Sequence, residues 1–148
     1  LSSAASDVYK RQVDSCGNIT NTIEKGKPFT VRMKVQMHAP IEYPIFALSI
    51  KDPKGTEITG TNTMFEKTDF EVGPIMEISF EQDMNLQGGE YLLSLGCTGY
   101  NGTDFTVYHR LYDVCNITVV SDKNTVGYYD MNSKITVQTY EGTNICRK

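Results

Sequence analysis

Apolar and polar residues alternate along most of this chain with a period of two, the spacing of strands that bury one face. In residues 29–37 (FTVRMKVQM) every second side chain is apolar, and Arg32, Lys34 and Gln36 fall on the opposite face. The same alternation recurs in residues 46–50, 76–80, 91–95, 115–119 and 135–137. The pattern predicts a series of short strands, each with one wet face.

Turn signals separate these segments, at Lys25-Gly26, Gly73-Pro74, Gly88-Gly89, Asn101-Gly102 and residues 122–124. Between residues 46–50 and the next extended run, Asp52-Pro53-Lys54-Gly55 has the composition of a tight turn and predicts a hairpin. About seven or eight short strands with no helical period favour an all-β fold, an antiparallel immunoglobulin-like β-sandwich. Tyr91, shortly after Gly89 at the start of a strand, is typical of the tyrosine corner of such sandwiches.

One set of residues resembles a known family over residues 15–138. The set is Pro44, Phe46, Ile50, Asp52, Gly55, Gly60, Asn62, Thr63, Leu86, Gly89 and Tyr91. In this spacing it resembles the C-terminal domain of Wzt, the ATP-binding subunit of bacterial ABC exporters for O-antigen and related polysaccharides. The matching glycines and Pro44 have backbone roles. Asn62 and Thr63 match a corner where a bond from side chain to backbone is expected.

The first residues suggest a foreign segment. Residues 7–12 (DVYKRQ) are the in-frame translation of GATGTGTATAAGAGACAG, which resembles the transposon mosaic end of sequencing libraries. We therefore expect residues 1–12 to be an adapter scar and residues 13–148 to be a single carbohydrate-binding sandwich. The resemblance implies that an ATPase domain, with its ATP and Mg²⁺, precedes it in the full protein and is missing here.

Composition argues against several functions. The 14 basic and 18 acidic residues give a net charge of −4, without a basic block for nucleic acid. Cys16, Cys97, Cys115 and Cys146 lack the spacing of a metal site, and we expect all of them to be reduced. No residue set indicates catalysis. His38 and His109 have no patterned partner, and an acidic solvent face explains Glu77 and Glu81 better than a glycosidase pair does.

Sugar binding needs aromatic faces and planar polar groups on a shallow surface, and the chain has nine tyrosines and no tryptophan. Residues 99–112 (GYNGTDFTVYHRLY) are dense in both and form a candidate ligand rim, although a polar hairpin would also explain them. The polar face of residues 29–37 is a second candidate. The predicted carbohydrate-binding residues are Arg32, Lys34, Gln36, Tyr100, Asn101, Tyr108, His109, Arg110 and Tyr112. No metal or cofactor is expected in this segment.

The sequence and the resemblance together predict a non-catalytic domain that recognises a lipid-linked O-antigen or another cell-surface polysaccharide for export. The resemblance implies a cytoplasmic position at the bacterial inner membrane, a transporter permease reached through the ATPase domain, and a homodimer. Residues 134–140 form a candidate strand for pairing between protomers. Two alternatives remain, a carbohydrate-binding module of a secreted polysaccharide-degrading enzyme and an immunoglobulin-like adhesion domain.

Overall fold

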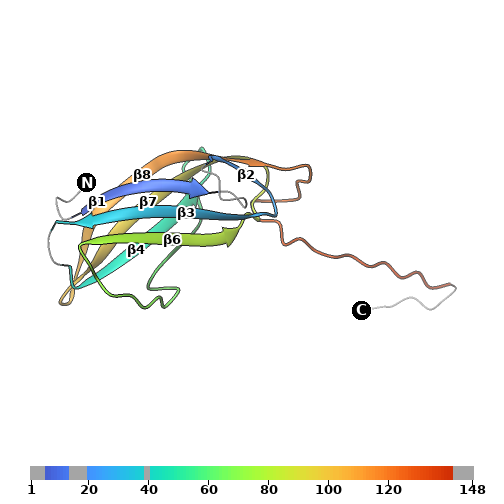
Figure 1. Cartoon of the computed structure of the whole chain (residues 1–148). Coiled ribbons are helices and arrows are strands. Elements are labelled where there is room, and N and C mark those ends of the chain that lie inside the picture. Colours follow the sequence, from blue (N-terminus) through green and yellow to red (C-terminus); the bar gives the residue numbers. More distant parts are fainter. Residues whose placement is uncertain (1–5, 14–19, 39–40, 142–148) are drawn as a thin grey trace.

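A computed structural model of the chain forms a two-layer β-sandwich (Figure 1). The structure describes residues 6–13, 20–38 and 41–141, and for 6–13, 101 and 109–115 it describes the backbone alone. Within these residues all regular elements are strands, eight in number, which confirms the predicted all-β sandwich. No helix in this part of the chain is long and apolar enough to cross a membrane. The strands are β1 (Ser6–Val13), β2 (Thr22–Glu24), β3 (Pro28–Met37), β4 (Tyr43–Lys51), β5 (Glu57–Asn62), β6 (Ile75–Asp83), β7 (Gly89–Asn101) and β8 (Asp104–Val120).

The strands form one three-stranded and one five-stranded sheet. The small sheet has the order β1-β3-β6, and the large sheet has the order β2-β8-β7-β4-β5. All neighbours are antiparallel except β2 and β8, which run parallel. The crossovers between sheets place strands distant in sequence side by side, as in immunoglobulin-like sandwiches.

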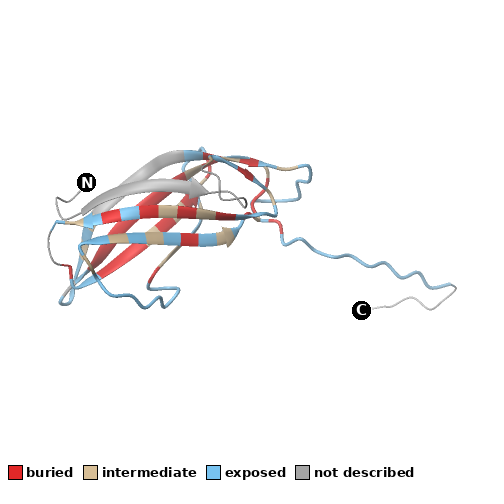
Figure 2. Ribbon diagram, viewed as in Figure 1, coloured by how far each residue is buried: buried red, intermediate tan, exposed pale blue. Residues whose placement is uncertain are grey.

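The predicted alternation decides which side chains form the core. In β3, Phe29, Val31, Met33 and Val35 are buried, whereas Lys34 and Gln36 are exposed. The same alternation of burial is visible along the strands in Figure 2. The large sheet contributes Phe46, Leu48, Ile50, Tyr91, Leu93, Leu95, Ile117 and Val119 to the same cluster. Residues spaced two apart therefore face each other across the sandwich, as the sequence predicts.

Three predicted corners are confirmed in atomic detail. The Asp52 carbonyl oxygen accepts a hydrogen bond from Gly55 N at 3.0 Å, and Gly55 has the positive φ of 87° that favours glycine. The Tyr91 hydroxyl donates to the carbonyl oxygen of Gln87, four residues upstream, as in a tyrosine corner. In the Asn-Thr corner, the Thr63 hydroxyl accepts from the backbone N–H of Phe46 at 3.2 Å.

The strand β1 includes residues 7–12, the segment interpreted as an adapter scar. It pairs with β3 in an antiparallel register from Ser6 opposite Met37 to Val13 opposite Thr30. This segment therefore forms most of the first strand of the sandwich. The assignment of residues 1–12 as foreign sequence stays a prediction.

Among the cysteines, Cys97 is a free, buried thiol in the core of the large sheet. Burial raises the pKa of this thiol to about 12, because the thiolate would be poorly solvated there. The reduced state of the four cysteines stays a prediction. Cys16 and Cys146 and the side chain of Cys115 lie outside the described residues.

The final predicted strand is wrong. Residues 131–141 form no strand, and Figure 1 shows them running away from the sandwich toward the C-terminus. The side chains of Ile135 and Val137 are each 83% exposed, although their spacing is that of a half-buried strand. Alternation alone does not supply a neighbour to pair with, and the described part of this chain offers none at this segment.

The segment before this tail is fixed to the sandwich by a buried ion pair. Lys25 Nζ lies 2.7 Å from Asp130 Oδ2, and both side chains are less than a tenth exposed. The hydrogen bond from Lys25, with further donors at Asn132 N and Lys123, holds the pKa of Asp130 well below its usual value. Nearby, the Tyr128 hydroxyl donates to Asp52 Oδ2 at 2.7 Å. This bond lowers the pKa of Asp52 and raises that of Tyr128.

Candidate functional site

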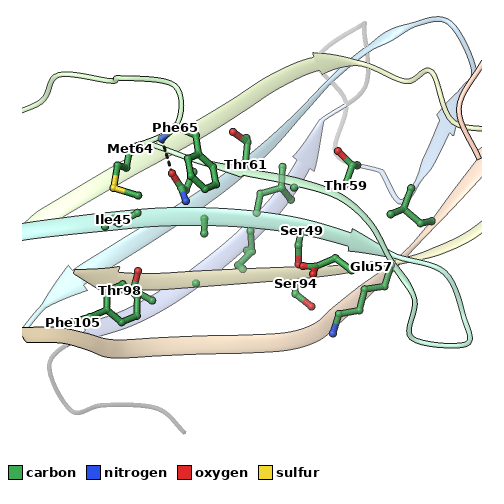
Figure 3. A pocket seen from close by; sticks show the side chains of 18 residues that line it. Ile45, Ser49, Glu57, Thr59, Thr61, Met64, Phe65, Ser94, Thr98 and Phe105 are labelled. Atoms are coloured by element: carbon green, nitrogen blue, oxygen red, sulfur yellow. Dashed lines mark hydrogen bonds between the residues drawn. The ribbon is translucent and has the colours of Figure 1, made fainter. Parts of the chain in front are cut away.

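The large sheet carries a hollow of about 790 Å³ on its outer face, turned away from the core. Figure 3 shows side chains of β4, β5, β7 and β8 around it. The volume is within the range of about 300–1,000 Å³ that is common for small-molecule sites. Because the hollow lies on an open sheet, a long molecule can cross it without threading.

The floor of the hollow consists of small residues. Ala47 stands opposite Gly96 in the ladder between β4 and β7, and Ser49 stands opposite Ser94. Residues directly opposite in an antiparallel ladder share a face, so these four positions form one continuous patch. Thr98 extends the patch along β7. The small side chains leave the space that larger residues would fill.

The walls are larger and mostly apolar. Met64 and Phe65 follow the end of β5, and Phe105 is the second residue of β8. Phe65 is 67% exposed, and its position depends on the predicted Asn-Thr corner. The Asn62 carboxamide oxygen accepts a hydrogen bond from the Phe65 backbone N–H at 2.7 Å, drawn as a dashed line in Figure 3. A family-like corner thus holds one wall of the hollow in place.

The hollow is close to neutral in charge. Lys51 and Glu57, of opposite sign, are the charged side chains among its lining residues. The remaining polar groups of the floor are hydroxyls, including those of Ser94 and Thr98, which are less than a tenth exposed. In the described residues no group of three or more His, Cys, Asp or Glu side chains is placed to hold a metal ion. Hydroxyls and apolar walls can bind a ligand by hydrogen bonds and packing.

The predicted sugar-binding residues do not form one cluster. Arg32, Lys34 and Gln36 lie on the outer face of the small sheet, on the opposite layer from the hollow. Tyr100 is on the outer face at the end of β7, and Tyr108 packs half-buried against the core. Four further candidates belong to the β7–β8 hairpin, and their side chains lie outside the described part: Asn101, His109, Arg110 and Tyr112.

Only part of the β7–β8 candidate rim can therefore be placed against the hollow. The backbone of Arg110 stands opposite Gly96, a residue of the floor. The position of Tyr108 favours a packing role. Phe105, which lies within the predicted rim segment, lines the hollow although it was not among the predicted residues. The sugar-binding roles of all nine residues stay predictions.

The floor residues were not predicted from the sequence. Their signal is the set of small residues at alternate positions of two strands, Ala47 and Ser49 in one and Ser94, Gly96 and Thr98 in the other. Each run looks like an ordinary wet face. Only the register between β4 and β7 brings the two runs together into a hollow.

The fold defines a β-sandwich domain with a hollow on the outer face of its large sheet. The family model described as Wzt C-terminal domain matches residues 11–131. The chain belongs to the Wzt C-terminal domain family, whose members are ABC-exporter-associated domains and generally non-catalytic. The match begins inside the segment interpreted as a scar. No curated protein sequence matches the chain.

One solved structure has the same fold. A crystal structure of the C-terminal domain of Wzt is similar with a TM-score of 0.84 and 21% identity, over 93% of this chain and 87% of that one. A CARDB domain from Pyrococcus furiosus, solved with di-metal ions, has a TM-score of 0.39 and 12% identity over 81% and 93% of the two chains. A β-glucosidase from Listeria innocua, solved with isofagomine, has a TM-score of 0.42 and 10% identity over 77% and 16%. TM-scores this low do not establish a shared fold with the CARDB domain or the β-glucosidase.

Proposed function

We propose that this domain binds a polysaccharide on the outer face of its large sheet and delivers it to an ABC exporter. The glycan is a lipid-linked O-antigen or another cell-surface polysaccharide. The observation that carries this proposal is the hollow itself, with a floor of small and hydroxyl-bearing residues and walls that include Phe65 and Phe105. Sugars present hydroxyls at their edges and an apolar face to aromatic rings, which such a surface complements.

The site suits weak recognition of one segment of a polymer. Shallow hydrogen bonding and ring stacking contribute on the order of 4 to 8 kcal/mol for a single site, which corresponds to millimolar to micromolar binding. A covalently attached ATPase domain, with its own ATP and Mg²⁺, would bring the bound glycan to the permease. Family membership favours this role over a secreted carbohydrate-binding module or an adhesion domain. It also favours a cytoplasmic position at the inner membrane.

The experiment that tests the binding face uses a large residue in the floor. Ala47→Phe fills the hollow opposite Gly96 without touching the core. Thr30→Phe is the matched control, because Thr30 lies on the outer face of the small sheet beside Arg32. Bacterial polysaccharides on a glycan array identify a binding glycan, and calorimetry with that glycan compares both variants.

We expect Ala47→Phe to weaken binding at least about tenfold and Thr30→Phe to leave it unchanged, because only the first removes ligand space. Circular dichroism shows that both variants remain folded. If Thr30→Phe abolishes binding and Ala47→Phe does not, the glycan binds the face of Arg32, Lys34 and Gln36. If no polysaccharide binds the unmodified domain, the proposed function is wrong.

The exposed tail supports a homodimer as part of the proposal. Ile135 and Val137 have the alternation of a strand but no neighbour among the described residues. The edge strand β6 has apolar side chains that the sandwich covers only in part. Its core-facing Met76 and Ile78 are only half-buried, and its outer face carries Glu77, opposite in charge to Lys134 of the tail. A tail from a second copy, added along β6, would cover these side chains.

Two substitutions that introduce charge into the tail test this dimer. Ile135→Asp with Val137→Asp puts charge where the exchanged strand would bury apolar side chains, so we expect a monomer by light scattering. Val126→Asp is the control, because Val126 is 94% exposed in a loop before the tail. A dimer that survives the double change, or an unmodified chain that is monomeric at high concentration, would contradict the exchange. Two linked sites in a dimer would raise the effective affinity for a polymer.

A further inference from the structure

A second hollow adjoins the first at the end of the large sheet. It measures about 290 Å³ and shares Ile45 and Met64 with the larger hollow. Its apolar lining comes from β4, from β7 and from the loop after β5. The lining includes Tyr43, Pro44, Phe70, Val72 and Tyr100. Because Ile45 and Met64 line both spaces, the two hollows are direct neighbours on the sheet.

A row of three aromatic side chains crosses the sheet at this junction. Tyr43 stands opposite Tyr100 in the ladder of β4 and β7, and Tyr100 stands opposite Phe105 in the ladder of β7 and β8. The rings of Tyr100 and Phe105 meet edge to face, with centroids 5.5 Å apart. Phe105 lines the large hollow, whereas Tyr43 and Tyr100 line the small one.

The exposure of this row calls for an explanation. Tyr43 is 60% exposed, Phe105 is 54% exposed and Tyr100 is 38% exposed. Three neighbouring aromatic side chains that face solvent form an exposed apolar patch, and such a patch does not stabilise the fold. Their ring faces can stack against the apolar faces of sugars that continue from one hollow into the other.

The charge of the small hollow differs from that of the large one. Glu42 and Asp69 both line it, and no Lys or Arg is among its described lining residues. The large hollow has Lys51 and Glu57, so its charges balance. A carboxylate or phosphate on a ligand would meet like charge in the small hollow, which disfavours binding. An uncharged sugar would meet hydrogen-bond acceptors.

We propose that the small hollow is a second sugar subsite, reached across the row of Tyr43, Tyr100 and Phe105, which accepts an uncharged sugar and rejects an anionic one. This inference depends on the proposed glycan-binding function. The domain then binds several consecutive sugars of one polysaccharide. The sugars that lie beside Glu42 and Asp69 are uncharged.

The probes are neutral mannan, galactan and glucan fragments of graded length, together with the same fragments after oxidation of their primary hydroxyls to carboxylates. The two members of each pair have the same sugars and linkages, and they differ at the oxidised carbon, where a neutral hydroxyl group becomes an anionic carboxylate. The proteins are the unmodified chain, Ala47→Phe, Tyr100→Ala, the double variant Glu42→Gln with Asp69→Asn, and the control Glu66→Gln. Glu66 is an exposed carboxylate in the same loop that lines neither hollow. Calorimetry measures the affinity of each pair.

For the unmodified chain we expect long neutral fragments to bind about tenfold more tightly than short neutral fragments. We also expect them to bind about tenfold more tightly than the oxidised fragments of the same length. Tyr100→Ala should remove the advantage of length and leave short fragments unaffected. The double variant should bind neutral and oxidised fragments within about twofold of each other, and Glu66→Gln should behave like the unmodified chain.

The outcomes separate this inference from the function on which it depends. If fragments bind and Ala47→Phe abolishes binding, but length, oxidation and Tyr100→Ala have no effect, the second subsite is wrong and the glycan site stands. A preference for oxidised fragments would also overturn the subsite. If no fragment, neutral or oxidised, binds the unmodified chain, both the glycan site and the subsite are wrong.

Discussion

The two faces of β4 and β7 are made by alternate residues of the same strands, yet they have opposite shapes. Toward the core these strands present large side chains such as Phe46, Leu48, Leu93 and Leu95, all buried. Toward solvent the middle of both strands presents small ones, Ala47, Ser49, Ser94 and Gly96. The inner face is full because its side chains meet another sheet. The outer face is hollow because its side chains are too small to fill it.

The comparison separates stability from binding. The inner face stabilises the sandwich by removing apolar area from water, a term proportional to the side chain buried. The outer face buries little apolar area on folding, so its residues can change with little effect on stability and are free to match a ligand. Substitutions on the inner face should therefore lower the free energy of unfolding, and those on the outer face should change affinity.

The largest effect should come from the inner face. Phe46 is fully buried in the core cluster, so Phe46→Ala should lower the free energy of unfolding by about 3–5 kcal/mol. Urea unfolding measures it. The neighbouring outer-face change Ser49→Ala is the control and should cost less than about 1 kcal/mol. Equal losses from both variants would contradict the division between the faces.

A smaller effect should come from the ion pair outside both faces. Asp130→Asn removes the negative charge beside Lys25 Nζ and should lower the melting temperature at neutral pH. The pKa of Asp130 is depressed in the folded chain, so its stabilisation is present above its ordinary pKa of 3.8 and is lost as pH falls further. Melting curves of both proteins should therefore differ at neutral pH and converge in acid. A constant difference down to strongly acidic pH would contradict this assignment.

The smallest effect should come from one hydroxyl of the floor. Thr98→Val keeps the shape of the side chain and removes one hydrogen-bonding group from the hollow. Loss of a hydrogen bond worth about 0.5–1.5 kcal/mol should weaken glycan binding by about twofold to twelvefold. Calorimetry measures the affinity, and urea unfolding should show little change. A large loss of stability with unchanged affinity would assign Thr98 to the fold instead.

Local signals explain why much of the fold could be predicted from the sequence. The alternation in β3 and the Asp52–Gly55 turn need only near neighbours, so residues 29–37 and the β4–β5 hairpin are found where expected. The tail shows the limit of the same signal. Ile135 and Val137 alternate as in a strand, but a strand requires a neighbour that the pattern does not specify.

The candidate site was less predictable because it is made by pairing. Ala47 and Gly96 are far apart in the sequence, and only the register of β4 against β7 joins them. The density of tyrosines predicts a ligand rim at residues 99–112, but Tyr108 in this segment packs against the core. Aromatic composition does not distinguish a ring that stacks on a ligand from one that packs inside.

The proposed glycan-binding surface is the outer face of the large sheet. It can be located by recording backbone amide chemical shifts while a binding polysaccharide fragment is titrated into the isotope-labelled chain. We expect the shift changes to concentrate in β4, β5 and β7 around Ala47, Asn62 and Gly96 and to continue toward Tyr100. Shifts concentrated instead in β3, around Arg32 and Lys34, would contradict it.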